Sequence, residues 1–200
     1  MDNFEFVKAT HTYLLNGEKI PSVSEIIAPL NSFETMPLDV LANAQRYGTS
    51  VHDTIAYWLK GELDEDSLDS GLVKPLEAFK SWYKLAKKIY GEPVASELPM
   101  YHKTLKYGGT PDLVFDEAIV DYKTRPFSKI TDTVQLAAYS HLVPEIPKKR
   151  LIVLELRTDG TYRVIDAKCR HAYAMFRELL KHYYAERELN TLIKNWRERT

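Results

Sequence analysis

Two aspartates and a lysine in the middle third of the chain have the types and the spacing that metal-ion chemistry requires. Asp112 and Asp121 lie at the outer ends of two strand-like segments that a short turn joins. Antiparallel pairing of these segments would place the two carboxylates nearly opposite each other. Lys123 follows Asp121 by two residues, and the period of a strand directs both side chains to one face. We therefore expect the three side chains to converge.

A site of this kind favours phosphodiester hydrolysis. Two carboxylates buried together are costly unless a cation compensates them, and their hard oxygen atoms suit Mg²⁺ or Mn²⁺. Such a cation lowers the pKa of a bound water and neutralises charge on a phosphodiester, while a neighbouring lysine orients the water or stabilises the developing charge. Taken alone, the same residues also fit a surface hairpin whose charges are solvated or paired. Short motifs match by chance, so other parts of the chain have to decide.

Four motifs in a fixed order make the nuclease interpretation specific. They are Tyr47-Gly48-Thr49-Ser50-Val51-His52, Gly108-Gly109-Thr110-Pro111-Asp112, Asp121-Tyr122-Lys123 and Gln135-Leu136-Ala137-Ala138-Tyr139. Together they resemble the PD-(D/E)XK nuclease superfamily in its RecB-like branch. The resemblance covers residues 48–139, and residues 4–27 also resemble the start of phage-type exonucleases in this superfamily.

The resemblance implies a metal centre that holds one or two Mg²⁺ or Mn²⁺ ions. Its ligands would be His52, Asp112, Asp121 and the backbone carbonyl of Tyr122, and Lys123 would be the catalytic lysine. A single histidine on a helix is more often a core residue than a ligand, but the motif favours the ligand role for His52. Asp121 stands where the family more often has glutamate, which shortens the reach to the metal by one methylene.

Further residues would support this centre or hold DNA. Gln135 and Tyr139 are four residues apart on an expected helix, so one face presents both to the site or to the substrate strand. Glu97 falls where such nucleases often carry a glutamate on the preceding strand, and would position a water or Lys123. A set of basic residues near the motifs is expected to hold phosphates without reading the base sequence: Lys103, Lys106, Arg125 and Lys129.

Composition limits the class of protein. The chain has 200 residues, and 27 Lys plus Arg against 28 Asp plus Glu give a formal net charge of −1. No global positive field therefore indicates a nucleic-acid partner, and local charge has to attract DNA. The single cysteine, Cys169, excludes a four-cysteine iron–sulfur cluster, so the resemblance is to the cluster-free form. The absence of a signal peptide and of a long apolar run predicts a cytoplasmic protein without a membrane span.

The elements that must position these residues follow from hydrophobic spacing and turn signals. Strand-like runs around Asn16-Gly17 predict an N-terminal β-hairpin, and Ser22 with Glu25 forms a capping box for a short helix. Residues 38–59 read as a helix, a break at Gly48-Thr49 and a second helix. The remaining expected elements are a helix over 72–89, strands over 94–101, 110–115 and 118–123, a helix over 132–142, strands over 151–157 and 162–167, and a helix over 170–199.

This order of elements predicts a mixed α/β fold in one domain over residues 1–200. The N-terminal hairpin and short helix take residues 1–30, the motif-bearing core residues 41–142, and the last strands with the terminal helix residues 150–200. The resemblance implies a restriction-endonuclease-like core, with helices flanking a central mixed β-sheet.

The leading hypothesis is a Mg²⁺- or Mn²⁺-dependent deoxyribonuclease, most simply an exonuclease, in DNA recombination, repair or phage replication. Its partners would be DNA and a single-strand annealing recombination protein, as the resemblance suggests. Two alternatives stay open: a DNA-binding adaptor that keeps the nuclease fold without turnover, and a structure-selective endonuclease. The complete set of Asp112, Asp121 and Lys123 weighs against the adaptor.

Overall fold

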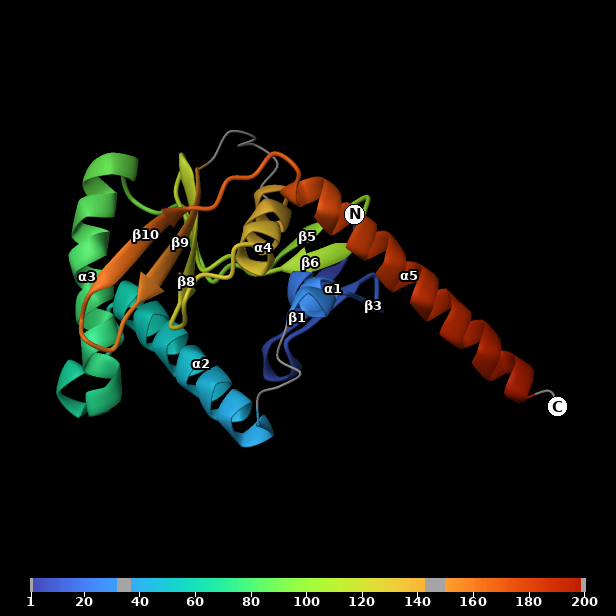
Figure 1. The fold of residues 1–200 in the computed structure, drawn as a ribbon, viewed down its shortest axis with the longest axis horizontal. Helices are drawn as coiled ribbons and strands as arrows, with labels where there is room; N and C mark the ends of the chain where they lie inside the picture. The colour runs from blue at the N-terminus through green and yellow to red at the C-terminus, as the bar shows by residue number, and fades with distance from the viewer. Residues whose placement is uncertain (1, 32–36, 143–149, 199–200) are drawn as a thin grey trace.

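Helices cover both faces of a central five-stranded sheet in the computed structural model, which describes residues 2–31, 37–142 and 150–198 (Figure 1). The strand order is β10-β9-β8-β7-β4. The strands are β4 (Ala95–Ser96), β7 (Leu113–Val114), β8 (Ala118–Lys123), β9 (Arg150–Leu156) and β10 (Tyr162–Asp166). β8 and β9 are parallel, and the other neighbouring pairs are antiparallel. The sheet is therefore mixed, and the predicted mixed α/β class is confirmed.

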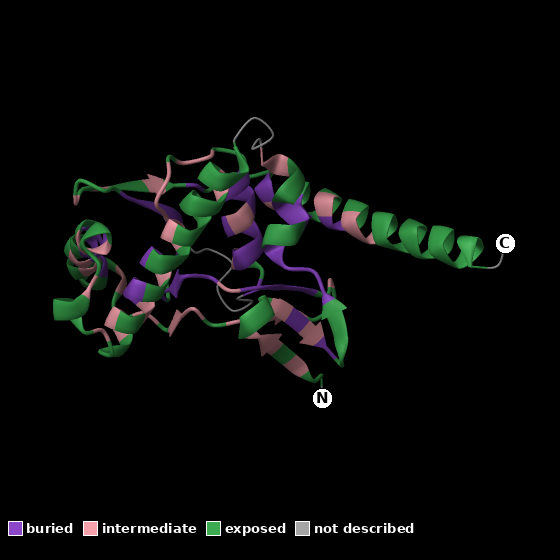
Figure 2. Cartoon of the chain, turned by 90° about the horizontal axis from the view of Figure 1, so that it is seen from below, coloured by how far each residue is buried: buried purple, intermediate pink, exposed green. Residues whose placement is uncertain are grey.

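Two helical layers enclose this sheet. α2 (Leu38–Lys60) and α3 (Ser70–Tyr90) pack on one face, and α1 (Val23–Ile27), α4 (Thr131–Ser140) and α5 (Ala172–Arg197) pack on the other. Buried residues gather where these helices meet the sheet, whereas the distal half of α5 is exposed (Figure 2). None of the described helices combines the length and the apolar character that a membrane span requires.

The alternation along β8 sorts its side chains between the two layers. Val120 and Tyr122 pack in the cluster beneath α2 and α3, whereas Ile119 packs with α4. Asp121 and Lys123 share the face of Ile119 because side chains alternate along a strand. Both charged residues therefore lie on the α4 side of the sheet, opposite to Tyr122.

A three-stranded antiparallel sheet begins the chain, in the order β1 (Phe4–Val7), β2 (Thr12–Leu15) and β3 (Glu18–Ile20). Asn16 and Gly17 form the β2–β3 turn, with φ of 55° and 81°. The Ser22 hydroxyl accepts the N–H of Glu25, whose carboxylate accepts the N–H of Ser22. The predicted hairpin and capping box are confirmed. Short 3₁₀ turns cover Lys8–Thr10, Ala28–Leu30 and Glu65–Ser67.

The N-terminal sheet packs against the segment that leads into Asp112. β6 (Tyr107–Gly109) pairs with β5 (Met100–His102) and passes beneath Tyr13. A Cβ atom on Gly108 would lie 2.5 Å from the ring of Tyr13, so a side chain here would force the two apart. The Tyr13 hydroxyl then lies 2.8 Å from Thr110 Oγ1. The hairpin thus stabilises the approach to Asp112.

Residue 199, the last of the predicted terminal helix, lies outside the described residues. Two local predictions are wrong. α2 is one continuous helix through Gly48, where a break was expected. A glycine inside a helix costs only about 1 kcal/mol relative to alanine, and burial of Val51 and Ile55 outweighs it. The expected strand over residues 94–101 is divided into β4 and β5, because Glu97 has a φ of 48° and Pro99 has no N–H to donate.

The hydroxyl of Tyr122 is buried and has no hydrogen-bond partner within the described part of the chain. An unpaired buried hydroxyl costs about 1–3 kcal/mol, so we expect Tyr122→Phe to raise the free energy of unfolding by about 1 kcal/mol in urea titrations. Tyr13→Phe is the matched control, since it removes a hydroxyl that contacts Thr110 and should destabilise the protein. Destabilisation by Tyr122→Phe would show that this hydroxyl has a partner, such as an ordered water.

Candidate active site

The candidate site lies at the paired ends of β7 and β8. Leu113 is opposite Val120, so the next positions along the ladder are Asp112 and Asp121. Both aspartates are buried, at 6% and 2% exposure. The N–H of Tyr122 donates to Asp112 Oδ2 at 2.6 Å, which fixes this carboxylate across the two strands. The structure thus brings the two predicted carboxylates together, as expected from antiparallel pairing of their strands.

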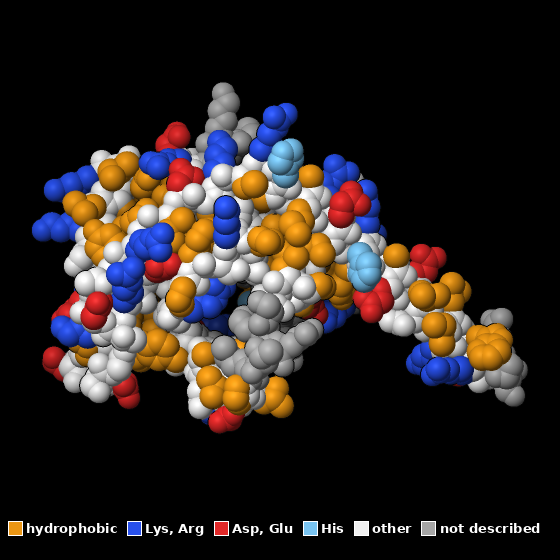
Figure 3. Space-filling model, viewed as in Figure 1, with side chains coloured by type: hydrophobic (Ala, Val, Ile, Leu, Met, Phe, Trp, Pro, Cys, Tyr) orange, Lys and Arg blue, Asp and Glu red, His pale blue; other side chains and the backbone are white. Residues whose placement is uncertain are grey.

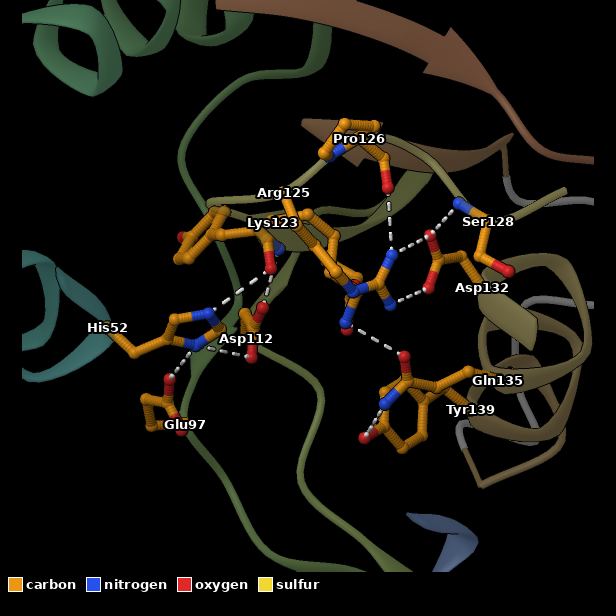
Figure 4. A network of polar contacts seen from close by, with 12 residues as sticks. His52, Glu97, Asp112, Lys123, Arg125, Pro126, Ser128, Asp132, Gln135 and Tyr139 are labelled. Atoms are coloured by element: carbon orange, nitrogen blue, oxygen red, sulfur yellow. Dashed lines mark hydrogen bonds and ion pairs between the residues drawn. The ribbon is translucent and has the colours of Figure 1, made fainter. Parts of the chain in front are cut away.

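His52 reaches this carboxylate from α2 (Figure 4). Its Nδ1 lies 3.3 Å from Asp112 Oδ1. On the other side of the ring, Nε2–H donates to the Tyr122 carbonyl at 3.2 Å, because a carbonyl oxygen can only accept. Histidines that bind metals are usually oriented in this way, with one nitrogen held by a backbone carbonyl and the other directed to the ion. The Tyr122 carbonyl therefore has an orienting contact with His52 in addition to its predicted place among the ligands.

Glu97 joins the group from the link between β4 and β5. Its φ of 48° lies in the left-handed region, which costs about 1–3 kcal/mol for a residue with a side chain and is often found at functional sites. Glu97 Oε1 lies 3.8 Å from His52 Nδ1. Potential ligand atoms of His52, Glu97 and Asp112 all lie within 4.8 Å of one another. The structure places Glu97 beside His52, and its expected role of positioning a water or Lys123 stays a prediction.

The residues present fit a divalent cation. Two carboxylate oxygens, Glu97 Oε1 and Asp121 Oδ2, are buried without a hydrogen-bond partner within the described part of the chain, although Asp121 Oδ2 is ion-paired to Lys123. A buried carboxylate is costly unless a cation or hydrogen bonds compensate it. Carboxylates and a neutral imidazole are both common ligands of divalent cations in proteins.

The pKa shifts in the site reflect this crowding of negative charge. Burial alone would lower the pKa of His52, but the carboxylates of Asp112 and Glu97 raise it well above its usual range. Burial raises the pKa of Glu97, and it raises the pKa of Asp121 to about 6, with the charge of Asp112 adding to both shifts. Burial acts on Asp112 in the same direction, but His52 and Lys123 hold the pKa of this carboxyl below its usual range.

Lys123 is held between a carboxylate and an amide. Its Nζ forms an ion pair with Asp121 Oδ2 at 2.5 Å and donates to Gln135 Oε1 at 2.9 Å. Gln135 Nε2 in turn donates to the Tyr139 hydroxyl at 3.2 Å. Gln135 and Tyr139 lie on one face of α4, as their spacing predicts. Gln135 therefore orients the lysine directly, and Tyr139 acts on it only through Gln135.

The basic residues near the motifs have different surroundings. Arg125 pairs with Asp132, a fully buried residue that the sequence analysis did not identify, because an acidic residue in the first turn of a helix is also a common helix-stabilising feature. Lys129 is exposed beside it. Lys103 and Lys106 lie on the β5–β6 turn, where Lys106 lines a groove between β3 and α5. The space-filling view shows a different hollow, near the middle of the molecule, with Lys and Arg side chains at its rim (Figure 3).

Comparisons with known proteins do not assign the chain to a family. No family model matches the sequence, and no curated protein matches it. The chain is similar to the crystal structure of an alkaline exonuclease (LHK-Exo) from Laribacter hongkongensis, at 14% identity over 76% of this chain and 86% of that chain, with a TM-score of 0.45. For LHK-Exo in complex with dAMP, the identity is 15% over 90% of this chain and 95% of that chain, with a TM-score of 0.47. Because both TM-scores fall below 0.5, the function has to be argued from the site itself.

Proposed function

We propose that this protein is a Mg²⁺- or Mn²⁺-dependent deoxyribonuclease. The observation that carries the proposal is the group of potential ligand atoms from His52, Glu97 and Asp112, with Asp121 and its ion-paired Lys123 on the adjoining strand. Within the described part of the chain, one carboxylate oxygen of Glu97 and one of Asp121 are buried without a hydrogen bond. Carboxylates that can hold a divalent cation next to a fixed lysine are what metal-assisted phosphodiester hydrolysis needs. The four motifs, through their resemblance to RecB-like PD-(D/E)XK nucleases, support DNA as the substrate.

The metal centre would use the residues at the ends of β7 and β8. One or two Mg²⁺ or Mn²⁺ ions would be held by His52, Glu97, Asp112 and Asp121, with the Tyr122 carbonyl as a further oxygen ligand. When bound, such an ion lowers the pKa of a water molecule and neutralises negative charge on the phosphodiester.

Hydrogen bonds within the chain orient the site residues before substrate binds. The Tyr122 N–H fixes Asp112, and the Tyr122 carbonyl fixes the ring of His52. The Lys123 ammonium, directed by Gln135, is placed to stabilise the negative charge that develops on the phosphoryl oxygens. Because these groups are already held by hydrogen bonds, little reorganisation accompanies the reaction.

The finer assignment rests on the family resemblance. We infer an exonuclease rather than a structure-selective endonuclease, because residues 4–27 resemble the start of phage-type exonucleases. The same resemblance supports a cytoplasmic setting in DNA recombination, repair or phage replication, with a single-strand annealing protein as partner. The complete set of ionisable residues favours an active enzyme over the adaptor.

Cleavage assays on linear and circular DNA test the proposal. We expect Mg²⁺ or Mn²⁺ to support release of nucleotides from labelled linear duplex or single strands, EDTA to abolish it, and excess Mg²⁺ to restore it, because the carboxylates need the cation. Covalently closed duplex and circular single strands should stay intact. Cleavage of these circles would favour the endonuclease instead. DNA binding without cleavage under every metal condition would contradict the nuclease assignment and favour the adaptor.

A further inference from the structure

Two buried carboxylates outside the metal site hold the loop that follows Lys123. Asp132 comes from the first turn of α4 and is 0% exposed, and Glu155 comes from β9 and is 5% exposed. Asp132 Oδ2 accepts the N–H of Ser128 at 2.7 Å, and Glu155 Oε1 accepts the N–H of Phe127 at 2.6 Å. Consecutive peptide groups of the loop are thus anchored from two different elements. A buried charge lowers the stability of a protein unless hydrogen bonds or an opposite charge compensate it, so both carboxylates depend on these contacts.

The same aspartate fixes the direction of Arg125. Arg125 donates from Nη1 to Asp132 Oδ2 at 3.0 Å and from Nη2 to Asp132 Oδ1 at 2.5 Å, which is a bidentate pair (Figure 4). Nη1 also donates to the Pro126 carbonyl at 3.0 Å. These three bonds use three of the five N–H donors of a guanidinium. The side chain remains 38% exposed, so it is accessible to a ligand, and two of its N–H donors are not used by these bonds.

Arg125 is well placed to contact the substrate. It lies two residues past Lys123, the last residue of β8, and its partner Asp132 belongs to α4, the helix that also carries Gln135. Arginine suits phosphate because its planar fork donates several N–H groups in fixed geometry. An arginine that is already held in one orientation loses less conformational entropy when it binds.

We propose that Asp132 is a positioning residue, which directs Arg125 to a phosphate of the DNA strand bound at the site. This inference rests on the proposed function, since it takes DNA as the ligand. Glu155 supports the arrangement by holding the neighbouring peptide group of the loop. Asp132 itself has no exposed surface and acts on the substrate only through Arg125.

For the loss of the Asp132 charge, the proposal and simple electrostatics predict opposite changes in the affinity for DNA. Asp132→Asn keeps the shape of the side chain and removes one negative charge near the DNA. If only the charge mattered, the variant would bind DNA more tightly. If Asp132 directs Arg125, the affinity falls about tenfold because a charged hydrogen bond is lost. The slope of log K against log salt should then decrease by about one, as expected for the loss of one phosphate contact.

Fluorescence anisotropy with a labelled single strand, with Ca²⁺ in place of Mg²⁺, measures both quantities. We expect equal losses of affinity and slope in Asp132→Asn and Arg125→Ala, and no further loss in the double variant, because the aspartate acts through the arginine. Asp166→Asn is the matched control, since it removes the carboxylate of an exposed arginine pair, 3.3 Å from Arg150, and should leave binding unchanged. Unchanged or tighter binding by Asp132→Asn, or additive losses in the double variant, would overturn the proposal.

If circular dichroism shows that Asp132→Asn does not fold, Arg125→Lys provides a second test. Arg125→Lys retains the charge but cannot form the bidentate pair, so it should bind DNA as weakly as Arg125→Ala. Parent-level binding by Arg125→Lys would also overturn the proposal. Parent protein that binds DNA without cleaving it contradicts the nuclease assignment alone, whereas parent protein that binds no DNA overturns both.

Discussion

Asp112→Asn should lower the rate of DNA hydrolysis about a thousandfold, which corresponds to about 4 kcal/mol of transition-state stabilisation. Asparagine has the shape of aspartate, and its amide oxygen can still accept the Tyr122 N–H that Asp112 Oδ2 accepts at 2.6 Å. The hairpin should therefore keep its geometry. What disappears is the charge at the centre of the cluster, between His52 and Asp121, and with it a ligand for the cation.

Initial rates of nucleotide release from linear DNA measure this effect, and calorimetric titration with Mn²⁺ measures the metal affinity, which should fall in parallel. Asp116→Asn is the matched control, because Asp116 is an exposed aspartate in the turn of the same β7–β8 hairpin and should have parent activity. Hydrolysis by folded Asp112→Asn within about threefold of the parent rate would remove Asp112 from the proposed metal centre.

Lys123→Met should lower kcat about a hundredfold to a thousandfold and leave the affinity for Mn²⁺ nearly unchanged. Methionine fills a similar volume but supplies no charge and no donor to Gln135, which the lysine contacts at 2.9 Å. The ammonium is proposed to stabilise charge that is present only in the transition state, so its loss should act on kcat more than on KM. This pattern differs from that of Asp112→Asn, which should lose metal affinity as well.

Lys84→Met provides the comparison, since Lys84 is exposed on α3 and belongs neither to the proposed metal centre nor to the residues expected to hold DNA. Single-turnover rates at saturating DNA separate the chemical step from binding. Parent kcat in Lys123→Met, or a loss confined to KM, would show that Lys123 only contributes to DNA binding.

Local rules account for the features that the sequence predicted well. Asn16 and Gly17 adopt the positive φ angles of a tight hairpin turn, and Ser22 with Glu25 closes a capping box. The positions of Asp112 and Asp121 along the β7–β8 ladder followed from strand pairing across a short turn. In each case the residues concerned are close in sequence, so backbone sterics and hydrogen bonds within one segment decide the outcome.

Features that depend on packing between distant segments were less predictable. The break expected at Gly48 is absent, because burial of one face of α2 outweighs the helix propensity of a single glycine. Glu97 lies beside His52 because its left-handed backbone divides the expected strand and redirects the side chain. Neither outcome has a signal in the local pattern of residue types.

The sequence by itself determined the mixed α/β class, the carboxylates and lysine that can meet on neighbouring strands, and a cysteine content too low for a four-cysteine iron–sulfur cluster within these 200 residues. Only the tertiary structure decided which groups surround them. His52 bonds to a carbonyl 70 positions away, and Asp132 bonds to Arg125 from another element. The physical reason is that spacing sets the direction of a side chain within its element, whereas packing between elements sets the neighbours, charges and burial that the side chain meets.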